Sequence, residues 1–396
     1  MELKPGYKRT EAGIIPEQWN CMKLGNFIAL QRGHDLTWRD RRQGDVPIMG
    51  SAGHNGFHDT AIVKGPGVVL GRSGASFGQA HYCAQDFWPH NTALYVTNFL
   101  GNFPLFVFYF LESIDFSRHN SGGAQQSLNR NFISPIAVGV PHPLEQTVIA
   151  NALSDTDALI QSLTSLIAKK RQIKQGAMQT LLNPYENGRL KEGWVVKKLS
   201  VMADIDPENL NASVNPNYKF KYISLDDVDK GVLRNYSDQI FETAPSRARR
   251  IVKKGDILFG TVRPNLQSHC LIKNHVEDLV CSTGFAVIRC RNNIANPPYI
   301  FSLFFAEFVE KQIQTLLAGS NYPAINSSDV RKLDIPLPQM DEQIHIAKIL
   351  SNMDTEIAAL EAKLAKYRHI KQGMMQNLLT GRIRLVKPDS NTGAFA

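Results

Sequence analysis

The sequence predicts an α+β protein in which two globular modules alternate with two long α-helices. One observation is an internal repeat: residues 122–182 align without a gap with residues 319–379, at a constant offset of 197. A repeat of this period indicates a duplicated domain rather than a solenoid of short units. The other two observations are that each copy ends in a stretch of helical periodicity, and that strand-like and turn-like segments precede each stretch. Together they predict a pseudo-two-fold arrangement.

The alternation sets the expected boundaries. We expect a first module over residues 1–141, a first helix over 142–184, a second module over 185–338, a second helix over 339–384 and a flexible tail over 385–396. A chain of 396 residues is long enough for two or three domains with full cores.

The composition is typical of a soluble globular protein, with 43% hydrophobic and 20% charged residues. The polar N-terminus does not resemble a signal peptide, and the longest apolar stretch, residues 103–111, is too short to span a bilayer. We therefore expect a cytoplasmic protein without a membrane partner. The five cysteines form no C-x-x-C pair and no metal-ligand spacing, which predicts reduced thiols and no metal site.

The net charge of +8 favours an anionic partner. The basic residues gather in clusters at 39–42, 169–171, 247–254 and 382–384. Any one cluster can be a solvated face. Several clusters on a duplicated frame favour contact with the phosphates of double-stranded DNA.

The second helix carries a nearly complete heptad seam. Its apolar residues alternate four and three apart from Ile346 to Leu378, and Lys371 is the one exception. This pattern predicts a coiled coil, and 38 helical residues extend for about 57 Å. The seam of the first helix is weaker, because Thr156, Lys170 and Lys174 interrupt it. We expect the two helices to pair with each other as an antiparallel coiled coil; the alternative is two ordinary core helices in separate domains.

The modules show strand and turn signals. Short apolar runs bounded by Gly, Asn and Asp predict strands at 67–71, 92–96, 255–260 and 284–288. One helix is expected in each module, at 104–113 and at 298–317. The modules share an entrance, since residues 19–24 match residues 194–199, but their interiors diverge heavily. Two readers of two different DNA sequences would have this pattern.

Gly-rich loops with polar side chains supply the candidate DNA-contacting residues. Loops at 71–79 and 260–265 occupy comparable places, as do the loops at 122–129 and 319–326. Such loops suit close approach to a backbone or a base edge, and Arg reads guanine while Asn or Gln reads adenine. A plain turn is the alternative for each loop. The candidates are Arg72, Ser73, Gln79, Gln125, Gln126, Arg247, Arg249, Arg263, Asn265, Ser320, Asn321 and Tyr322.

Two other classes of function stay open. The tetrapeptide Asn296-Pro297-Pro298-Tyr299 matches the catalytic loop of adenine amino-methyltransferases, so a self-sufficient adenine-N6 DNA methyltransferase is one alternative. However, no buried strand precedes it, no convincing Gly-rich loop for S-adenosylmethionine accompanies it, and prolines in a first helical turn explain it well. The other alternative is a coiled-coil assembly protein without a DNA role. The sequence contains no Walker A loop, which argues against a motor.

The motifs resemble those of a known family. Residues 13–19 with Lys23-Leu24 resemble the entry motif of specificity subunits of type I restriction-modification enzymes. The segments 141–146 and 335–343 resemble that family's helix leaders, although His142-Pro143 departs from the usual pair. The most specific likeness is the helix end Ile-Lys-Gln-Gly-x-Met-Gln-x-Leu-Leu, which occurs in both copies and is followed in the second by the closing segment 380–384.

The resemblance implies a non-catalytic DNA-recognition subunit. Each module would be a target recognition domain that reads one half of a bipartite DNA sequence, and the helices would set the unread gap. The resemblance implies no cofactor in this chain. It implies partner subunits, namely modification (methyltransferase) subunits, two in number, that carry S-adenosylmethionine, and restriction (motor-nuclease) subunits that use ATP and Mg²⁺. The helices and their ends would be the docking surface for the modification subunits.

Overall fold

The computed structural model describes residues 3–120, 126–317 and 324–386 and divides into two compact units. Unit 1 comprises Met1–Thr164 with Ala362–Ala396, and unit 2 comprises Ser165–Glu361. Both units contain part of each long helix, α4 (Pro143–Leu181) and α9 (Met340–Leu378). The units therefore cut across the boundaries expected from the sequence. We call the described residues of unit 1 before α4 module 1, and those of unit 2 between α4 and α9 module 2.

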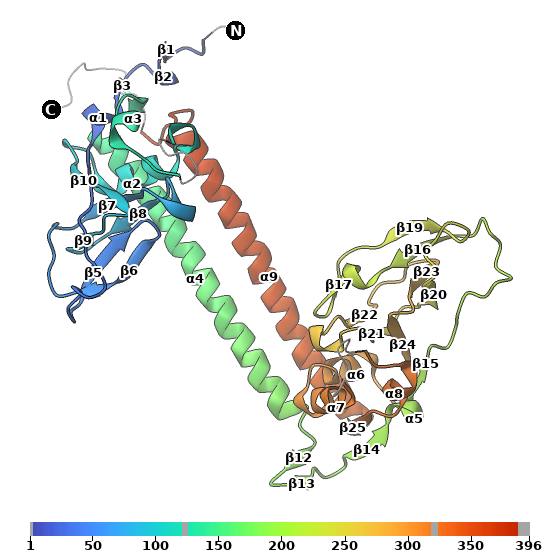
Figure 1. Cartoon of the computed structure of the whole chain (residues 1–396). Coiled ribbons are helices and arrows are strands. Elements are labelled where there is room, and N and C mark those ends of the chain that lie inside the picture. Colours follow the sequence, from blue (N-terminus) through green and yellow to red (C-terminus); the bar gives the residue numbers. More distant parts are fainter. Residues whose placement is uncertain (1–2, 121–125, 318–323, 387–396) are drawn as a thin grey trace. The chain divides into compact units, whose positions relative to one another are not determined.

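Figure 1 shows the elements of both units. The strands of module 1 are β1 (Tyr7–Thr10), β2 (Gly13–Pro16), β3 (Asn20–Lys23), β4 (Ala29–Arg32), β5 (Val46–Gly50), β6 (Gly53–His58), β7 (Gly67–Gly71), β8 (Ala80–Cys83), β9 (Trp88–Pro89), β10 (Ala93–Asn98) and β11 (Ala137–Val140). Its helices are α1 (Leu24–Phe27), α2 (Pro104–Glu112) and α3 (Arg130–Ile133), with the short 3₁₀ segments η1 (Gly74–Ser76) and η2 (Ser117–His119).

Module 2 has a similar set of elements. Its strands are β12 (Tyr185–Glu186), β13 (Arg189–Leu190), β14 (Val195–Lys198), β15 (Ala203–Ile205), β16 (Lys219–Ile223), β17 (Val228–Asp229), β18 (Val232–Leu233), β19 (Ser237–Ile240), β20 (Ala248–Ile251), β21 (Ile257–Gly260), β22 (Cys270–Leu271), β23 (Leu279–Ser282), β24 (Phe285–Cys290) and β25 (Asp334–Leu337). Its helices are α5 (Leu199–Met202), α6 (Pro297–Leu303), α7 (Glu307–Leu317) and α8 (Ser327–Arg331), with η3 (Leu225–Asp227) and η4 (Pro264–Leu266).

The two modules have the same central topology although their sequences diverge. The four-stranded sheet of module 1 has the order β4-β10-β7-β8, and that of module 2 has the order β15-β24-β21-β22. Each module also has a second sheet with one parallel pair, β5 with β9 and β16 with β23. The strands occur in corresponding chain order, so the duplication extends through the module interiors. The expected α+β fold with two repeated modules is confirmed.

The start of each module is tied to its exit. The entrance strand β3 pairs with β11, and β14 pairs with β25, so the strand that leads into each long helix closes on the beginning of its own module. The entrance tryptophans are buried. Trp19 Nε1 donates to Glu145 Oε2 at 3.0 Å, and Trp194 Nε1 donates to Glu342 Oε1 at 3.2 Å. The shared entrance motif therefore holds the first turn of the following helix.

The long helices run antiparallel to each other in each unit. In unit 1, Lys371 near the end of α9 pairs with Asp157 of α4 at 2.9 Å. In unit 2, Lys174 near the end of α4 pairs with Asp354 of α9. These lysines interrupt the heptad seams, and the structure shows the reason: the two ion pairs are related by the repeat offset, so each lysine meets a carboxylate on the other helix instead of an apolar residue.

The helix expected over 298–317 is not continuous. The chain forms α6, then a break at residues 304–306, then α7. Phe304 and Ala306 within the break are buried, as are Val309 and Ile313 of α7. The break turns α7 so that these side chains enter the same core as α6. In module 1 the corresponding expectation is confirmed, because α2 covers residues 104–112.

No helix in the described ranges is both long enough and apolar enough to cross a membrane.

Candidate nucleic-acid interface

The candidate DNA-contacting residues of the two modules lie on equivalent loops. In module 1, Arg72 follows β7; its N–H donates to the Thr92 carbonyl (3.0 Å) and its carbonyl accepts from Leu128 N–H (2.8 Å). In module 2, Thr261 follows β21; its N–H donates to the Gly284 carbonyl (2.8 Å) and its carbonyl accepts from Ile325 N–H (3.0 Å). The loop that contains Leu128 in module 1 and Ile325 in module 2 leads out of each module, and we call it the exit loop. The same two bonds therefore hold Arg72 between the turn before β10 and the exit loop of module 1, and Thr261 between the turn before β24 and the exit loop of module 2.

Each of these loops begins at a glycine that has no room for a side chain. A Cβ atom on Gly71 would lie 1.9 Å from the Ser76 carbonyl oxygen, and a Cβ atom on Gly260 would lie 2.6 Å from the Ser268 carbonyl oxygen. Both distances are far below van der Waals contact with backbone that cannot move independently. The β7–β8 loop (residues 72–79) and the β21–β22 loop (residues 261–269) therefore turn back tightly on the strand that carries them, which fixes their direction.

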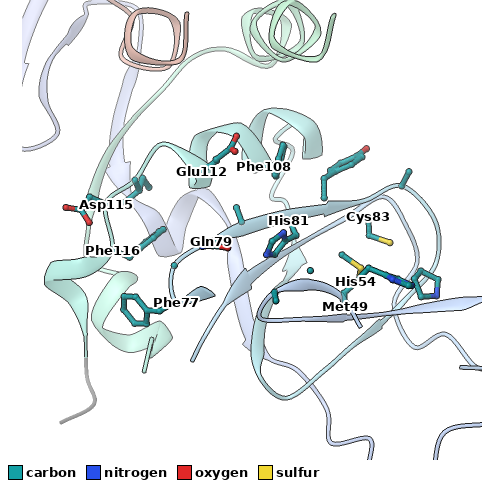
Figure 2. A pocket seen from close by; sticks show the side chains of 18 of the residues that line it. Met49, His54, Phe77, Gln79, His81, Cys83, Phe108, Glu112, Asp115 and Phe116 are labelled. Carbon is teal, nitrogen blue, oxygen red and sulfur yellow. The ribbon is translucent and has the colours of Figure 1, made fainter. Parts of the chain in front are cut away.

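In module 1 the structure brings two predicted residues together. Exposed Gln79 and exposed Gln126 line one groove, which we call the glutamine groove. Figure 2 shows this groove between the β-hairpins and α2, with Gln79 and His81 near its centre and Glu112 and Asp115 along the helical side. His81 Nε2 donates to the Ser51 carbonyl at 3.1 Å, which leaves Nδ1 unprotonated in the neutral ring. Gln125 lies outside the described residues.

The charges in the glutamine groove suit base edges better than phosphates. Hydrogen bonds from Ser117 keep the pKa of Asp115 below its usual value, so this carboxylate stays ionised. Glu112 on the same side is a second carboxylate. Carboxylates repel phosphate, whereas amide and imidazole groups can donate and accept hydrogen bonds with bases.

Arg72 lies in a different groove. This second groove, the arginine groove, is also lined by Arg32, Arg130, Ser127 and Asn129. Arg72 is half-buried, and its Nη1 donates to the Asn91 carbonyl at 3.4 Å. Three guanidinium groups around one groove suit phosphate oxygens. Arg32 and Arg130 were not predicted from the sequence, because they come from distant segments and no local pattern marks them.

Ser73 is not among the residues that line either groove. It forms a β-bridge with Ser127, and its carbonyl accepts a 2.6 Å hydrogen bond from Ser51 Oγ. Its role in the structure is to join the β7–β8 loop to the exit loop and to the β5–β6 turn. The backbone of Ser73 therefore stabilises the position of the β7–β8 loop.

In module 2, Arg263 and Asn265 are both exposed on the β21–β22 loop. They lie at the start of η4 and inside it. Arg263 has φ +48° and Gln267 has φ +55°, so both ends of η4 adopt the left-handed conformation that non-glycine residues rarely take. Such conformations cost roughly 1–3 kcal/mol each and are found at functional loops.

The basic cluster at 247–250 does not form one cationic face. Arg247 is exposed, and Arg249 is partly buried with its guanidinium 4.7 Å from the centre of the Phe241 ring. Arg250 points inward and forms an ion pair with Asp206. The Arg247 carbonyl accepts from Thr283 N–H (2.8 Å), beside the Gly284 carbonyl that holds Thr261. Arg247 therefore lies at the same end of module 2 as the β21–β22 loop.

The candidates Ser320, Asn321 and Tyr322 lie outside the described residues.

A buried histidine supports the β21–β22 loop. His269 is fully buried and stacks on Phe259, with ring centroids 4.2 Å apart. Its Nδ1 accepts from Gly260 N–H at 3.0 Å, so Nε2 carries the proton of the neutral ring. Burial lowers the pKa of His269 to about 3. The imidazole therefore stays neutral under ordinary conditions and acts as a fixed acceptor beneath the loop.

The tetrapeptide Asn296-Pro297-Pro298-Tyr299 starts helix α6. The Asn296 side chain accepts from Tyr299 N–H at 3.1 Å and caps the helix. The Tyr299 side chain is fully buried, and its hydroxyl donates to the Pro336 carbonyl at 2.9 Å. Both residues that define the methyltransferase motif are thus engaged in local structure.

A repeated glutamine binds the segment just before the short helix in both modules. Gln343 at the start of α9 accepts from Asn296 N–H at 2.9 Å and donates to the carbonyls of Ile294 and Pro338. Gln146 at the start of α4 accepts from Phe103 N–H at 2.9 Å and donates to Asn102 Oδ1 and to the Pro141 carbonyl. Both glutamines are almost fully buried and are separated by the repeat offset of 197. They join each long helix to its own module.

The cysteines are all free, and Cys21 alone is exposed. Burial raises the pKa of the Cys270 and Cys290 thiols to about 12, which keeps them protonated. Among the described residues no group of three His, Cys, Asp or Glu side chains could hold a metal ion.

Two modules of one topology, each presenting equivalent loops with different polar side chains, define a protein with two related but distinct recognition surfaces. The family model of the type I restriction modification DNA specificity domain matches the chain twice, over residues 16–175 and 191–367. The chain belongs to this family and contains two copies of its domain. The resemblance found in the sequence motifs is confirmed.

Relatives extend over nearly the whole chain. The type I restriction enzyme MjaVIII specificity subunit of Methanocaldococcus jannaschii is 24% identical over 408 residues, covering 96% of each chain. The EcoDI specificity subunit of Escherichia coli is 21% identical over 425 residues, covering 96% of this chain and 93% of its own. The crystal structure of the type I restriction-modification system S subunit from M. genitalium has the same fold, with a TM-score of 0.65 at 16% identity over 96% of this chain and 98% of its own.

Proposed function

We propose that this chain acts as the DNA-recognition subunit of a type I restriction-modification enzyme and that each module reads one half of a bipartite DNA target. The observation that carries the proposal is the pair of equivalent loops with different side chains. Arg72 and Gln79 lie on the β7–β8 loop of module 1. The equivalent β21–β22 loop of module 2 carries Thr261, Arg263 and Asn265 instead. Two loops with the same backbone bonds but different side chains fit two half-sites of different sequence.

The helices α4 and α9 set the length of the unread gap and hold the modification and restriction subunits. The chain itself catalyses no reaction. S-adenosylmethionine, ATP and Mg²⁺ are bound by the partner subunits. The capping role of Asn296 and the burial of Tyr299 support this division of labour, because neither side chain is available to a flipped adenine.

The proposal is tested by mapping methylated adenines in a host that carries the complete system. We expect a bipartite sequence with a fixed gap. Replacing residues 51–120 of module 1 by the corresponding segment of a relative should change one half-site and leave the other half-site and the gap unchanged. A change in both half-sites would contradict the assignment of one half-site to each module.

The role of the helices is tested by lengthening them. One heptad inserted near Ile160 in α4, together with one heptad in the antiparallel stretch of α9, should lengthen the gap without altering either half-site. Insertion into both helices preserves the repeat-related ion pairs, whereas insertion into α4 alone serves as the mismatched control. Altered half-sites would mean that the helices take part in reading.

The methyltransferase alternative makes the opposite prediction. If the isolated chain transfers methyl groups from S-adenosylmethionine to DNA, and Asn296→Ala abolishes the transfer, the proposed function is wrong. We expect no transfer by the isolated chain, and full methylation when the modification subunits are added.

A further inference from the structure

The connection between β4 and β5 in module 1, residues 33–45, ends in an exposed aromatic–cationic tip. Thr37–Asp40 forms a tight turn, in which Asp40 N–H donates to the Thr37 carbonyl at 3.1 Å and Thr37 Oγ1 donates to the Asp40 carboxylate. Trp38 and Arg39 are the two central residues of this turn, so their side chains project from its tip. The Trp38 side chain is 76% exposed, and the Arg39 guanidinium lies 5.4 Å from its ring centre.

Both flanks of the tip are anchored. On one side Leu36 is buried. On the other side Arg41 Nη1 donates to the Asn55 carbonyl at 2.8 Å, and Arg42 pairs with Asp59 at 2.6 Å. Arg41 and Arg42 are therefore used to fix the loop, whereas the ion pairs of the described residues do not include Arg39. An indole held open to water on an anchored turn carries a solvation cost that burial against a partner would remove.

The tip adjoins the arginine groove. Arg32 and Asp35, just before the turn, line that groove together with Arg72 and Arg130. The Asn91 side chain donates to Asp35, and the Asn91 carbonyl accepts from Arg72, so one residue bridges the tip segment and the β7–β8 loop. The groove lined by Arg32, Arg72 and Arg130 therefore adjoins the segment that carries the exposed ring, with the Asp35 carboxylate between them.

Module 2 has no counterpart of this tip. Its corresponding connection between β15 and β16, residues 206–218, contains no Arg, Lys or Trp. Instead its acids are bound inward: Asp206 pairs with Arg250, and Glu208 pairs with Lys253 and Arg289. The connection between β15 and β16 thus folds back onto module 2, whereas the connection between β4 and β5 projects from module 1.

We propose that Trp38 and Arg39 form an additional DNA contact of module 1, in which the indole packs against a base or sugar in a groove of the duplex and the guanidinium neutralises the adjacent phosphate. This inference rests on the proposed function, because it needs module 1 to bind DNA. In a duplex, arginine contacts phosphates and base edges, and apolar side chains contact base edges in the grooves. The contact adds affinity to one half-site only.

The experiment measures binding of the full chain to the duplex that carries its mapped target. Trp38→Ala with Arg39→Ala removes the tip, and Trp38→Phe keeps an aromatic ring. The matched control is Arg9→Ala with Ile14→Ala, which removes one exposed arginine and one exposed apolar side chain from neighbouring positions of the β1–β2 hairpin. Circular dichroism melting verifies that every variant is folded.

We expect the tip variant to lose at least about tenfold in affinity, Trp38→Phe to retain most of it, and the control to stay within about twofold. The loss should shrink at high salt, because one phosphate contact is removed. Binding of the tip variant within about twofold of the wild type, or an equal loss in the control, overturns the proposal.

A second measurement follows tryptophan fluorescence when the duplex binds. Acrylamide quenches exposed tryptophan; Trp19 and Trp194 are buried and Trp88 is partly buried, so comparison with Trp38→Phe separates the signal of Trp38 from that of Trp88. Saturation with the target duplex should reduce quenching of the wild-type chain, and the reduction should be absent in Trp38→Phe. Unchanged quenching of the wild type would place the indole outside the complex. If no bipartite target can be mapped at all, the proposed function fails first, and it fails independently of the tip.

Discussion

Module 1 and module 2 hold their loops with the same backbone bonds but use their charged residues differently. In module 2 two arginines, Arg250 and Arg289, are turned inward. Arg289 forms two hydrogen bonds with Asp256, which is 1% exposed, and a further ion pair with Glu208. In module 1, Arg32, Arg39 and Arg130 are exposed along one groove and its rim. The duplicated frame therefore fixes where the loops begin and end, whereas the positions of the arginines differ between the two modules.

The inward network of module 2 also gives that module an internal polar core. The guanidinium of Arg250 reaches Asp206 and Ser327, which joins β20, the β15–β16 connection and α8. No equivalent of this network is formed among the described residues of module 1, where the corresponding connection carries the Trp38–Arg39 tip. Module 1 therefore exposes cations that module 2 uses for its own stability.

The largest expected effect comes from the repeated glutamines, which belong to the common frame. Gln343→Leu leaves Asn296 N–H and the Pro338 carbonyl without partners in a buried place. We expect a loss of roughly 3 kcal/mol in the stability of module 2, and an equal loss in module 1 for Gln146→Leu. Hydrogen exchange followed by mass spectrometry, which resolves the two modules, measures each loss separately. Exposed Ile344→Ala on the same helix is the control.

Equal losses would show that the frame is energetically symmetric. A loss confined to one of the two variants would break the comparison, because it would mean that the repeated hydrogen bonds serve only one module.

The frame was predictable from the sequence, and the site was predictable only in part. Repeat offset and heptad spacing are properties of residue order, so the module boundaries on each side of α4 and α9 could be approached without coordinates, and Gln146 and Gln343 stand at matching places in the motifs. The break between α6 and α7 could not be predicted, because it depends on Phe304 and Ala306 entering a core built from distant strands. Arg32 and Arg130 were missed for the same reason: the arginine groove is made by the fold, not by a motif.

The loop glycines are expected to have the next largest effect. Gly71→Ala places a Cβ atom 1.9 Å from the Ser76 carbonyl oxygen, so the β7–β8 loop must shift. We expect a loss of about 2 kcal/mol in stability and weaker binding of the half-site read by module 1. Gly74→Ala is the control inside the same loop, because its Cβ would meet nothing within 4 Å, although its φ of +77° adds some strain. If Gly74→Ala weakens binding more than Gly71→Ala, the close approach of Gly71 to the Ser76 carbonyl does not determine the conformation of the β7–β8 loop.

Acid should distinguish the two modules through His269. Its pKa in the folded protein is about 3, below the value of 6.5 for an unperturbed histidine, so the unfolded chain takes up the proton first. The contribution of this group to stability is complete above pH 6.5 and falls as the pH drops toward 3. We expect a loss of roughly 2.7 kcal/mol by pH 4.5, at about 1.36 kcal/mol for each of the two pH units below 6.5. In module 1 the corresponding position is Ala80, which does not titrate; burial in that module lowers the pKa of His90 instead, so the acid response of module 1 comes from a different place in the module.

Substitution isolates this effect. His269→Gln keeps an acceptor for Gly260 N–H, and hydrogen exchange of module 2 should then lose its acid dependence between pH 6.5 and 4.5. Acid dependence that persists unchanged in the variant would assign it to the carboxylates of the Arg289 network instead.

The smallest effect concerns the repeat-related lysines of the long helices. Lys371 lies 2.9 Å from Asp157, 3.7 Å from Glu112 and 5.4 Å from the centre of the Tyr109 ring, whereas Lys174 pairs with Asp354. We therefore expect Lys371→Ala to cost about 1 kcal/mol in unit 1 and Lys174→Ala to cost about 0.5 kcal/mol in unit 2. Hydrogen exchange of the helix amides at low and high salt measures both costs. Salt should reduce the Lys174 cost more, because the Lys371 ammonium is less exposed and has two carboxylates and a ring around it. A larger cost for Lys174 would mean that the helix pairing is held mainly in unit 2, and that the extra partners of Lys371 add specificity of register rather than stability.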